Sequence, residues 1–312
     1  MFYKYINLLF RFVIGIVAIW FIYLKISDDF IDNLNDINFE LLKWPLLILT
    51  TILMLLNWGI EAAKWRFAIR NVSDVGFIKA MRLTFTGITI GLLTPNRIGE
   101  IPARAALLKT NFLKDVILKT AVSSFSQVVI TFLLGGLGLM LTQDYFNLVF
   151  NPFWVNLLIT VVLIILIIIY FNLTKISFLF KLLNFLGNDN LIKSLVTIKR
   201  IDLVYLLLFS LLRYLVFFLQ YWLVLLAFNV KLSGINELLL IPVCFLFTSS
   251  IPTLLISEIG VRGSVAILVF GVVSDLSIQI IMASVLLWLI NVSLPALLGF
   301  YDLKEFKLIK EK

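Results

Sequence analysis

The sequence predicts an all-helical protein that crosses a membrane several times and forms a single integral membrane domain over residues 1–312. Hydrophobic side chains make up 62% of the 312 residues, and charged side chains only 14%. Long runs such as 154–170 and 203–228 contain one charged residue or none. A soluble protein of this length has too little interior to bury so much apolar surface. We therefore expect these runs to lie in a lipid bilayer.

Six stretches are long and apolar enough to cross the roughly 30 Å of hydrocarbon, which takes about 20 helical residues. The first is followed by acidic residues rather than by a small-residue cleavage site, so we interpret it as a retained helix. The six expected spans cover residues 7–26, 45–63, 119–142, 153–172, 203–228 and 277–300.

Two further regions, 75–118 and 236–274, are apolar but interrupted. We expect each to form a broken or re-entrant helical hairpin, because proline and glycine interrupt helices. Two full spans in one of these regions or in both, giving eight or ten spans in total, fit the same sequence. The expected structural breaks are Pro95, Gly99, Pro102, Pro252 and Gly260.

Basic residues divide the chain into two sides. Of the 26 lysines and arginines, ten lie in segment 64–119 and five in 172–202, whereas the alternate loops are acidic or poor in charge. By the positive-inside rule, we expect both termini in the cytoplasm and the two hairpins to enter the membrane from opposite faces. Such an inverted arrangement brings the two tips together near the bilayer midplane, where transporters bind their substrates.

Two short charged motifs lie in the interrupted regions. In each, an arginine follows a glutamate by four residues, so the two side chains can form an ion pair on one helical face. Pairing lowers the cost of placing charge in lipid, which is about 3 kcal/mol per residue on insertion scales. The charged residues are Arg97, Glu100 and Arg104 in the first motif and Glu258 and Arg262 in the second.

Two interpretations of these pairs fit the sequence. In one, the ion pairs only fasten the hairpins to the bundle. In the other, the arginines bind an anionic headgroup and the glutamates orient them, since the planar fork of arginine matches phosphate and stays charged when desolvated. On the second interpretation, the substrate-binding residues are Arg97, Glu100, Arg104, Arg213, Glu258 and Arg262.

Arg213 lies near the middle of an expected span, where a charge needs a partner. Ser210, Arg213 and Gln220 fall on one helical stripe, so we expect them to face the protein interior. Pairing of Arg213 with Glu258 or Glu100 and contact with a substrate both fit this position.

Two other polar stripes lie within the spans. In the span 119–142, small and polar residues recur at a spacing that is typical of close helix packing more than of a transport pathway. This stripe comprises Thr120, Ser124, Gln127, Thr131, Gly135 and Gly138. At the cytoplasmic end of the second span, we expect an interfacial charge cluster of Glu61, Lys64 and Arg66 with the interfacial anchors Trp58 and Trp65.

The residue content argues against several classes of function. The chain has no histidine, and its one cysteine, Cys244, lies in an apolar run, so we expect no metal, haem or other cofactor. It has no phosphate-binding glycine loop and no nucleophile elbow, and we assign no catalytic residue. The net charge is +8, but the basic residues flank the spans. We therefore expect contacts with anionic lipid headgroups rather than with nucleic acid.

The two charged motifs resemble those of one membrane protein family. The pattern Pro, Arg-x-Gly-Glu, Arg at 94–104 resembles the first motif of the lysylphosphatidylglycerol synthase transmembrane-region family, also called the flippase-like domain family. The stretch 252–263 resembles its second motif, and the likeness covers roughly residues 8–300. The second family motif usually has glycine near 257–258 and an acid after the arginine. This chain departs from it with Ser257, Glu258 and Gly263.

In bifunctional members of that family, a membrane region moves aminoacylated phospholipid across the bilayer and a separate soluble domain charges the lipid. Other relatives are associated with polyprenyl-linked sugars or glycolipids. The resemblance implies the membrane part alone, without aminoacyltransferase activity, in a bacterial cytoplasmic membrane.

Our hypothesis from the sequence is a transporter, not an enzyme, that moves an anionic amphiphile between leaflets. The amphiphile is a phospholipid, an aminoacyl-phospholipid or a polyprenyl-phosphate-linked lipid. One alternative is a membrane enzyme acting on a lipid-linked substrate, with Glu100 and Glu258 as its carboxylates. Another is an accessory scaffold that docks a partner enzyme in the same membrane through the basic loop 173–202.

Overall fold

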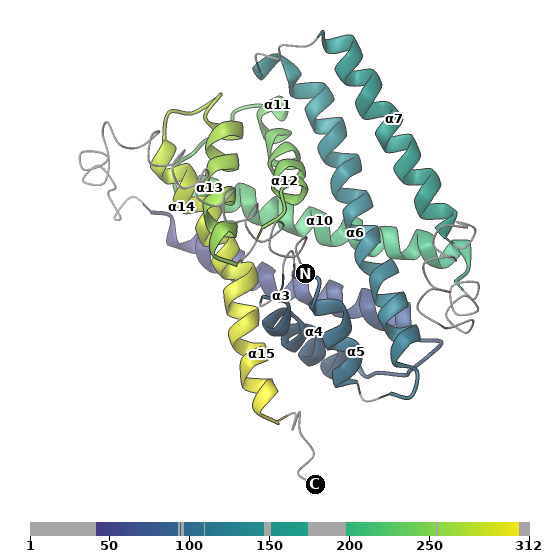
Figure 1. The fold of residues 1–312 in the computed structure, drawn as a ribbon. Helices are drawn as coiled ribbons and strands as arrows, with labels where there is room; N and C mark the ends of the chain where they lie inside the picture. The colour runs from purple at the N-terminus through teal and green to yellow at the C-terminus, as the bar shows by residue number, and fades with distance from the viewer. Residues whose placement is uncertain are drawn as a thin grey trace, which may run out of the picture.

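The chain folds as a bundle of helices in the predicted order (Figure 1). The computed structural model describes residues 42–92, 94, 97–108, 110–146, 151–173, 198–253 and 255–305. Within these residues every regular element is a helix, so the predicted all-helical fold is confirmed. The expected span at 7–26 and the expected break at Pro95 lie outside the described residues.

Five helical segments of the described chain are long and apolar enough to cross a membrane, and each coincides with a predicted span. Two of them, α3 and α6, extend about six residues beyond the prediction toward the segment that joins them. The fifth consists of α14 (Ser277–Trp288) and α15 (Leu294–Glu305), joined by a π-helical turn at Leu289–Ser293. The other four are α3 (Trp44–Ile69), α6 (Leu113–Thr142), α7 (Pro152–Phe171) and α10 (Arg200–Ala227).

The two interrupted regions form broken hairpins. Their helices have at most 16 residues, or roughly 24 Å, which is shorter than the roughly 30 Å of hydrocarbon. The structure therefore favours broken hairpins over extra full spans. Figure 1 shows the two hairpins at opposite ends of α6. The first contains α4 (Phe77–Gly91) and α5 (Glu100–Leu107), and the second contains α11 (Ile235–Leu238), α12 (Leu240–Ser250) and α13 (Leu255–Phe270).

Two of the expected breaks lie between helices and two do not. Pro252 lies between α12 and α13, and Gly99 immediately precedes α5. Pro102, in contrast, is in the first turn of α5. Backbone N–H groups in the first turn have no intrahelical acceptor, so proline, which has no N–H, costs the helix no hydrogen bond there. Gly260 is buried inside α13, which continues through it. The predictions of breaks at Pro102 and Gly260 are therefore wrong.

The exposure of α7 indicates which surface faces lipid. Only Leu163 and Tyr170 of its 20 residues are buried, and its exposed side chains are apolar along the whole helix except at Thr160. A helix with apolar residues on all sides is stable against lipid rather than against water. The structure thus supports a polytopic membrane protein.

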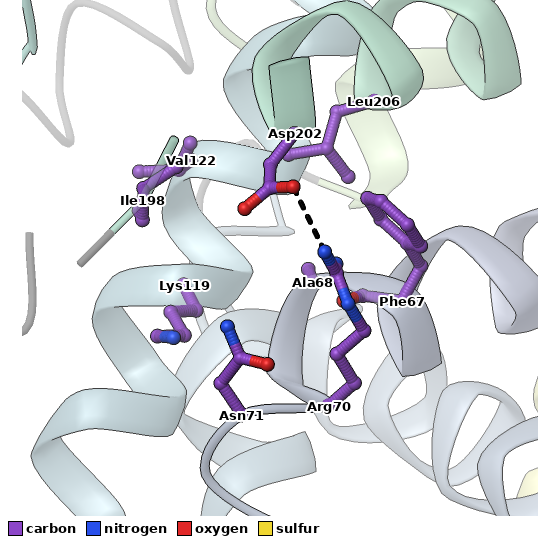
Figure 2. Close-up of a pocket in the computed structure, with 9 residues that line it drawn as sticks. All are labelled: Phe67, Ala68, Arg70, Asn71, Lys119, Val122, Ile198, Asp202 and Leu206. Atoms are coloured by element: carbon purple, nitrogen blue, oxygen red, sulfur yellow. Dashed lines mark hydrogen bonds and ion pairs between the residues drawn. The ribbon is translucent and has the colours of Figure 1, made fainter. Parts of the chain in front are cut away.

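A charged cluster at the ends of α3 and α10 fastens these helices to each other. Figure 2 shows Arg70, just after α3, reaching Asp202 in the first turn of α10, with an Nη2–Oδ1 distance of 2.8 Å. The guanidinium group of Arg70 also lies 3.7 Å from the ring centroid of Phe67. Lys119 of α6 lines the same small pocket. The cluster contains none of the motif residues, so we assign it a structural role.

Candidate functional site

The tips of the two hairpins meet through one ion pair. Arg97 Nη2 lies 2.5 Å from Glu258 Oε1, which joins the two charged motifs directly. The backbone of Arg97 has a φ of 56°, in the left-handed region that few residues other than glycine adopt. Such strain persists only where the surroundings hold it, and it is common at functional sites. The predicted meeting of the tips is therefore seen in the structure.

The turn before α5 requires glycine at position 99. The backbone N–H of Gly99 donates to Thr94 Oγ1 over 2.8 Å. A Cβ atom on Gly99 would lie 2.6 Å from the Thr94 side chain, closer than any normal contact. A larger residue would displace this turn, which carries Arg97 to the other hairpin.

Both predicted i,i+4 ion pairs are present. Arg262 donates from Nε and Nη2 to Glu258 Oε1, at 3.1 and 2.9 Å. Arg104 forms an ion pair with Glu100 in α5. Glu258 therefore binds an arginine of its own helix together with Arg97 of the other hairpin.

Glu61 of α3 is the centre of a second cluster that includes the first motif. Its carboxylate lies 2.8 Å from Lys64 Nζ, 3.1 Å from Arg104 Nη1 and 3.1 Å from Arg213 Nη1. The side chains of Glu61 and Lys64 are only 6% and 1% exposed. Two helices, α3 and α10, and the first hairpin thus share one carboxylate.

The prediction of an interfacial cluster at this end of α3 is wrong. Glu61 and Lys64 are buried among other helices, and only Arg66 is exposed. Trp58 and Trp65 are also buried, donating to Asn291 O at 3.1 Å and to Thr120 Oγ1 at 2.8 Å. The partners of Glu61 come from distant segments, so the sequence of α3 alone gave no signal for its role.

Arg213 faces the interior, as predicted for its stripe, but its partners differ from those expected. It binds Glu61 rather than Glu258 or Glu100, and its Nε donates to Asn57 Oδ1 over 2.8 Å. Its guanidinium group also lies 4.8 Å from the ring centroid of Trp58, a distance at which a cation–π contact is favourable.

The two clusters carry an excess of positive charge. Among their described residues, five cations accompany three carboxylates, so the formal excess is two positive charges. Buried charge without a counterion is costly, and the excess favours a bound anion. The cations are Lys64, Arg97, Arg104, Arg213 and Arg262, and the carboxylates are Glu61, Glu100 and Glu258.

A cavity of about 190 Å³ lies where the clusters approach each other. Arg213 and Arg262 both line it. Within the part of the chain that the structure describes, Nη2 of Arg213 and Nη1 of Arg262 form no hydrogen bond. Arg104, in contrast, is buried behind the cavity with Glu61 and Glu100 as partners. The complete lining is Gln127, Thr131, Arg213, Tyr214, Phe217, Phe245, Thr248, Ser249 and Arg262.

The polar stripe of α6 serves both packing and the cavity. At Gly135, an added Cβ would lie 2.5 Å from Leu246 Cβ, and at Gly138 it would lie 3.0 Å from the Leu239 carbonyl oxygen. Glycine therefore lets α6 approach α12 closely, as expected for a packing stripe. Thr131 and Gln127, which lie one and two turns before Gly135, line the cavity instead.

Carboxylates and thiols do not gather into a metal site in the described ranges. No group of three or more histidine, cysteine, aspartate or glutamate side chains there is arranged to hold a metal ion. The acidic residues of the site bind arginine and lysine instead. The site offers cationic donors and a polar cavity.

The fold and the site define a polytopic membrane protein with two broken hairpins that meet beside a cavity lined by arginine. The chain belongs to the lysylphosphatidylglycerol synthase TM region family, whose sequence model matches residues 8–299. The resemblance seen in the two motifs is therefore confirmed. Comparison with individual curated proteins gives no match.

Proposed function

We propose that this protein binds the anionic headgroup of a membrane lipid between Arg213 and Arg262 and moves the lipid between leaflets. The observation that carries the proposal is the pair of guanidinium groups, each with an unused nitrogen, at one cavity of a positively charged network. Hydrogen bonds from arginine to phosphate are strong because both groups are charged. Glu61 and Glu258 hold the two arginines in place from behind.

The arrangement also suits movement of an amphiphile. A headgroup passes through the polar cavity while its acyl or prenyl chains stay in the surrounding lipid, so the chains never leave an apolar environment. The Arg97–Glu258 contact joins the two hairpins, which lie at opposite ends of α6 (Figure 1), and Glu258 belongs to the hairpin that lines the cavity. A change in this contact would alter access to the two sides of the site.

The engagement of the carboxylates favours transport over lipid chemistry. A general base needs a carboxylate that can reach a proton of the substrate. Glu61 binds three cations, Glu258 binds two and Glu100 binds Arg104, so all three carboxylates already serve as counterions. We therefore propose a protein that is not an enzyme and whose partners are membrane lipids. The enzyme and scaffold hypotheses are outcomes of the following test.

Reconstitution tests the proposal directly. Purified protein in liposomes that contain fluorescent phospholipid or polyprenyl-phosphate probes should transfer at least one probe between leaflets faster than protein-free liposomes do. Quenching of the outer leaflet by dithionite measures the transfer. A folded sample that transfers none of the probes contradicts the proposal and favours an enzyme or a scaffold.

We propose a bacterial cytoplasmic membrane with both termini inside, because the basic segment 64–119 then faces the cytoplasm. Single cysteines in a Cys244→Ser background test this orientation with a maleimide that does not cross membranes. Asp144→Cys should react in right-side-out vesicles and Asn71→Cys only in inverted ones, since both native side chains are exposed. The opposite pattern would reverse the proposed orientation.

A further inference from the structure

We infer that Lys64 is a proton-exchange site coupled to the cavity: it takes up a proton when an anion binds to Arg213 and releases that proton when the anion leaves. The lipid therefore moves together with a proton. This inference rests on the proposed function and adds the ion that accompanies the lipid. It follows from the position of Lys64 within the Glu61 cluster and from a row of hydroxyl groups beside it.

Among the five cations of the two clusters, Lys64 is the group that can release a proton. The other four are arginines, which stay protonated in proteins. Lysine, in contrast, can exist as a neutral amine when it is buried. Lys64 is 0% exposed, and its Nζ lies 2.8 Å from Glu61 Oε2. A neutral amine also donates a hydrogen bond over that distance, so this contact persists after the proton leaves.

The charges that face Lys64 depend on whether an anion occupies the cavity. Glu61 of the same helix attracts a proton on Lys64, and Glu100 lies behind Arg104 as a second carboxylate. Arg213 of α10 and Arg104 of α5 repel the proton. Arg213 Nη1 lies 3.1 Å from Glu61 Oε2, the same oxygen that binds Lys64. An anion on Arg213 offsets the charge of that arginine and so favours a proton on Lys64. By linkage, the proton strengthens anion binding to the same degree.

The exchange also keeps the charge of the network constant. Five cations and three carboxylates leave an excess of two positive charges, which falls to one when Lys64 is neutral. A phosphodiester carries a single negative charge, so binding of the lipid together with a proton leaves this excess unchanged. A lipid that crosses the membrane with that proton moves no net charge, and the membrane potential does not oppose it.

A row of hydroxyl groups leads away from Lys64 between α10 and α6. Lys64 Nζ lies 3.5 Å from Ser210 Oγ, which in turn lies 2.8 Å from Ser126 Oγ. Ser126 donates its single proton to Ser123 O over 2.6 Å, so Ser210 is the donor to Ser126. The hydrogen bonds of the row therefore all point away from Lys64, the direction in which a released proton travels.

Ser123 extends the row toward the pocket at the ends of α3 and α10 (Figure 2). Its own hydroxyl group is buried and has no hydrogen-bond partner among the residues that the structure describes. Lys119, one turn before Ser123, lines that pocket together with Arg70, whose side chain is 40% exposed. A proton from Lys64 passes along the row as each oxygen accepts one proton and gives up another. Only N–H and O–H bonds break and form.

Proton uptake on lipid binding is the first measurement, because it needs only the wild-type protein. Purified protein in lightly buffered detergent is titrated with short-chain phosphatidylglycerol, and a pH-sensitive dye counts the protons. We expect about one proton per bound lipid. Because the bound state holds more protons, lipid affinity should fall as the pH rises, by up to about tenfold per pH unit.

The same titration separates the inference from the proposed function. Lipid that binds without proton uptake at every pH between about 6 and 9 would overturn the inference and leave the proposed function intact. Absence of any lipid binding would contradict the proposed function, and the inference with it.

Two substitutions assign the proton to Lys64. Lys64→Arg keeps the charge but cannot release the proton, and Lys64→Met has none to exchange. Both should bind the lipid without proton uptake and with an affinity that does not change with pH. The fold tolerates the loss of Lys64 because Glu61 retains Arg104 and Arg213. Lys79→Met, at an exposed lysine of α4, is the matched control and should take up the proton as wild type does.

Glu100→Gln decides between Lys64 and a carboxylate. Glu100 binds a single cation, Arg104, among the described residues, so it is the other group of the clusters able to accept a proton. Retained uptake in Glu100→Gln, with loss of uptake in a folded Lys64 variant, supports the inference. Uptake that survives in the Lys64 variants, or that disappears in Glu100→Gln, would make the inference wrong. If neither Lys64 variant folds, the result with Glu100→Gln decides.

Discussion

Replacing both Arg213 and Arg262 with glutamine should abolish lipid transfer while the protein still folds. Each arginine contributes hydrogen bonds to a charged ligand, worth about 1.5–3 kcal/mol apiece, so each single variant should lose roughly 10- to 150-fold in affinity. The fold tolerates the change because Glu61 keeps Lys64 and Arg104, and Glu258 keeps Arg97. Dithionite quenching in liposomes measures the transfer, and thermal unfolding in detergent checks the fold.

Lysine variants and a distant arginine make this test specific. Arg213→Lys and Arg262→Lys keep the charge but lose the planar fork, so their activity should lie between wild type and glutamine. Arg66→Gln removes an exposed arginine of α3 outside the site and should transfer at the wild-type rate. Undiminished transfer by the folded double glutamine variant would rule out the cavity as the headgroup site.

The positions of the spans could be predicted because hydrophobic length determines them. Residues 153–172 and 203–228 agree closely with α7 and α10, since few charges interrupt either run. The hairpins were predictable for the opposite reason, because Pro252 breaks an apolar run at its middle. The predictions of breaks at Pro102 and Gly260 were wrong because proline is stable in the first turn of a helix and glycine is stable inside a packed helix.

The site was only partly predictable, because ion pairs between distant segments leave no local pattern. The spacing of Glu100 and Arg104 predicted their pair, since four residues make one helical turn. From the sequence, Glu61 was expected near the membrane interface, at the end of a span. Only the packing of α3 against α10 and the first hairpin places it between Arg104 and Arg213. The availability of Arg213 and Arg262 to a ligand likewise depends on which nitrogens their partners occupy.

Removal of the Glu61 carboxylate should cause the largest loss of stability of any single substitution in the site. In Glu61→Ala, Lys64 loses its ion-pair partner, and Arg104 and Arg213 each lose one. Leaving a buried charge without its partner costs about 3–5 kcal/mol. We expect little folded protein in the membrane and a much lower unfolding temperature for what is recovered. Size-exclusion chromatography and thermal unfolding in detergent measure both effects.

A second substitution separates the charge effect from the loss of side-chain volume. Glu61→Gln keeps the shape and should still destabilise the protein strongly, because the amide cannot neutralise three cations. Adding Lys64→Met to Glu61→Gln should restore part of the lost stability, because it removes the most deeply buried of the charges left without a partner. The effects of the two substitutions on stability should therefore be non-additive. Asp144→Asn, at an exposed carboxylate beyond α6, is the control and should unfold like wild type. If Glu61→Gln is as stable as this control, Glu61 does not hold the cluster together, and the arginines at the cavity owe their positions to other contacts.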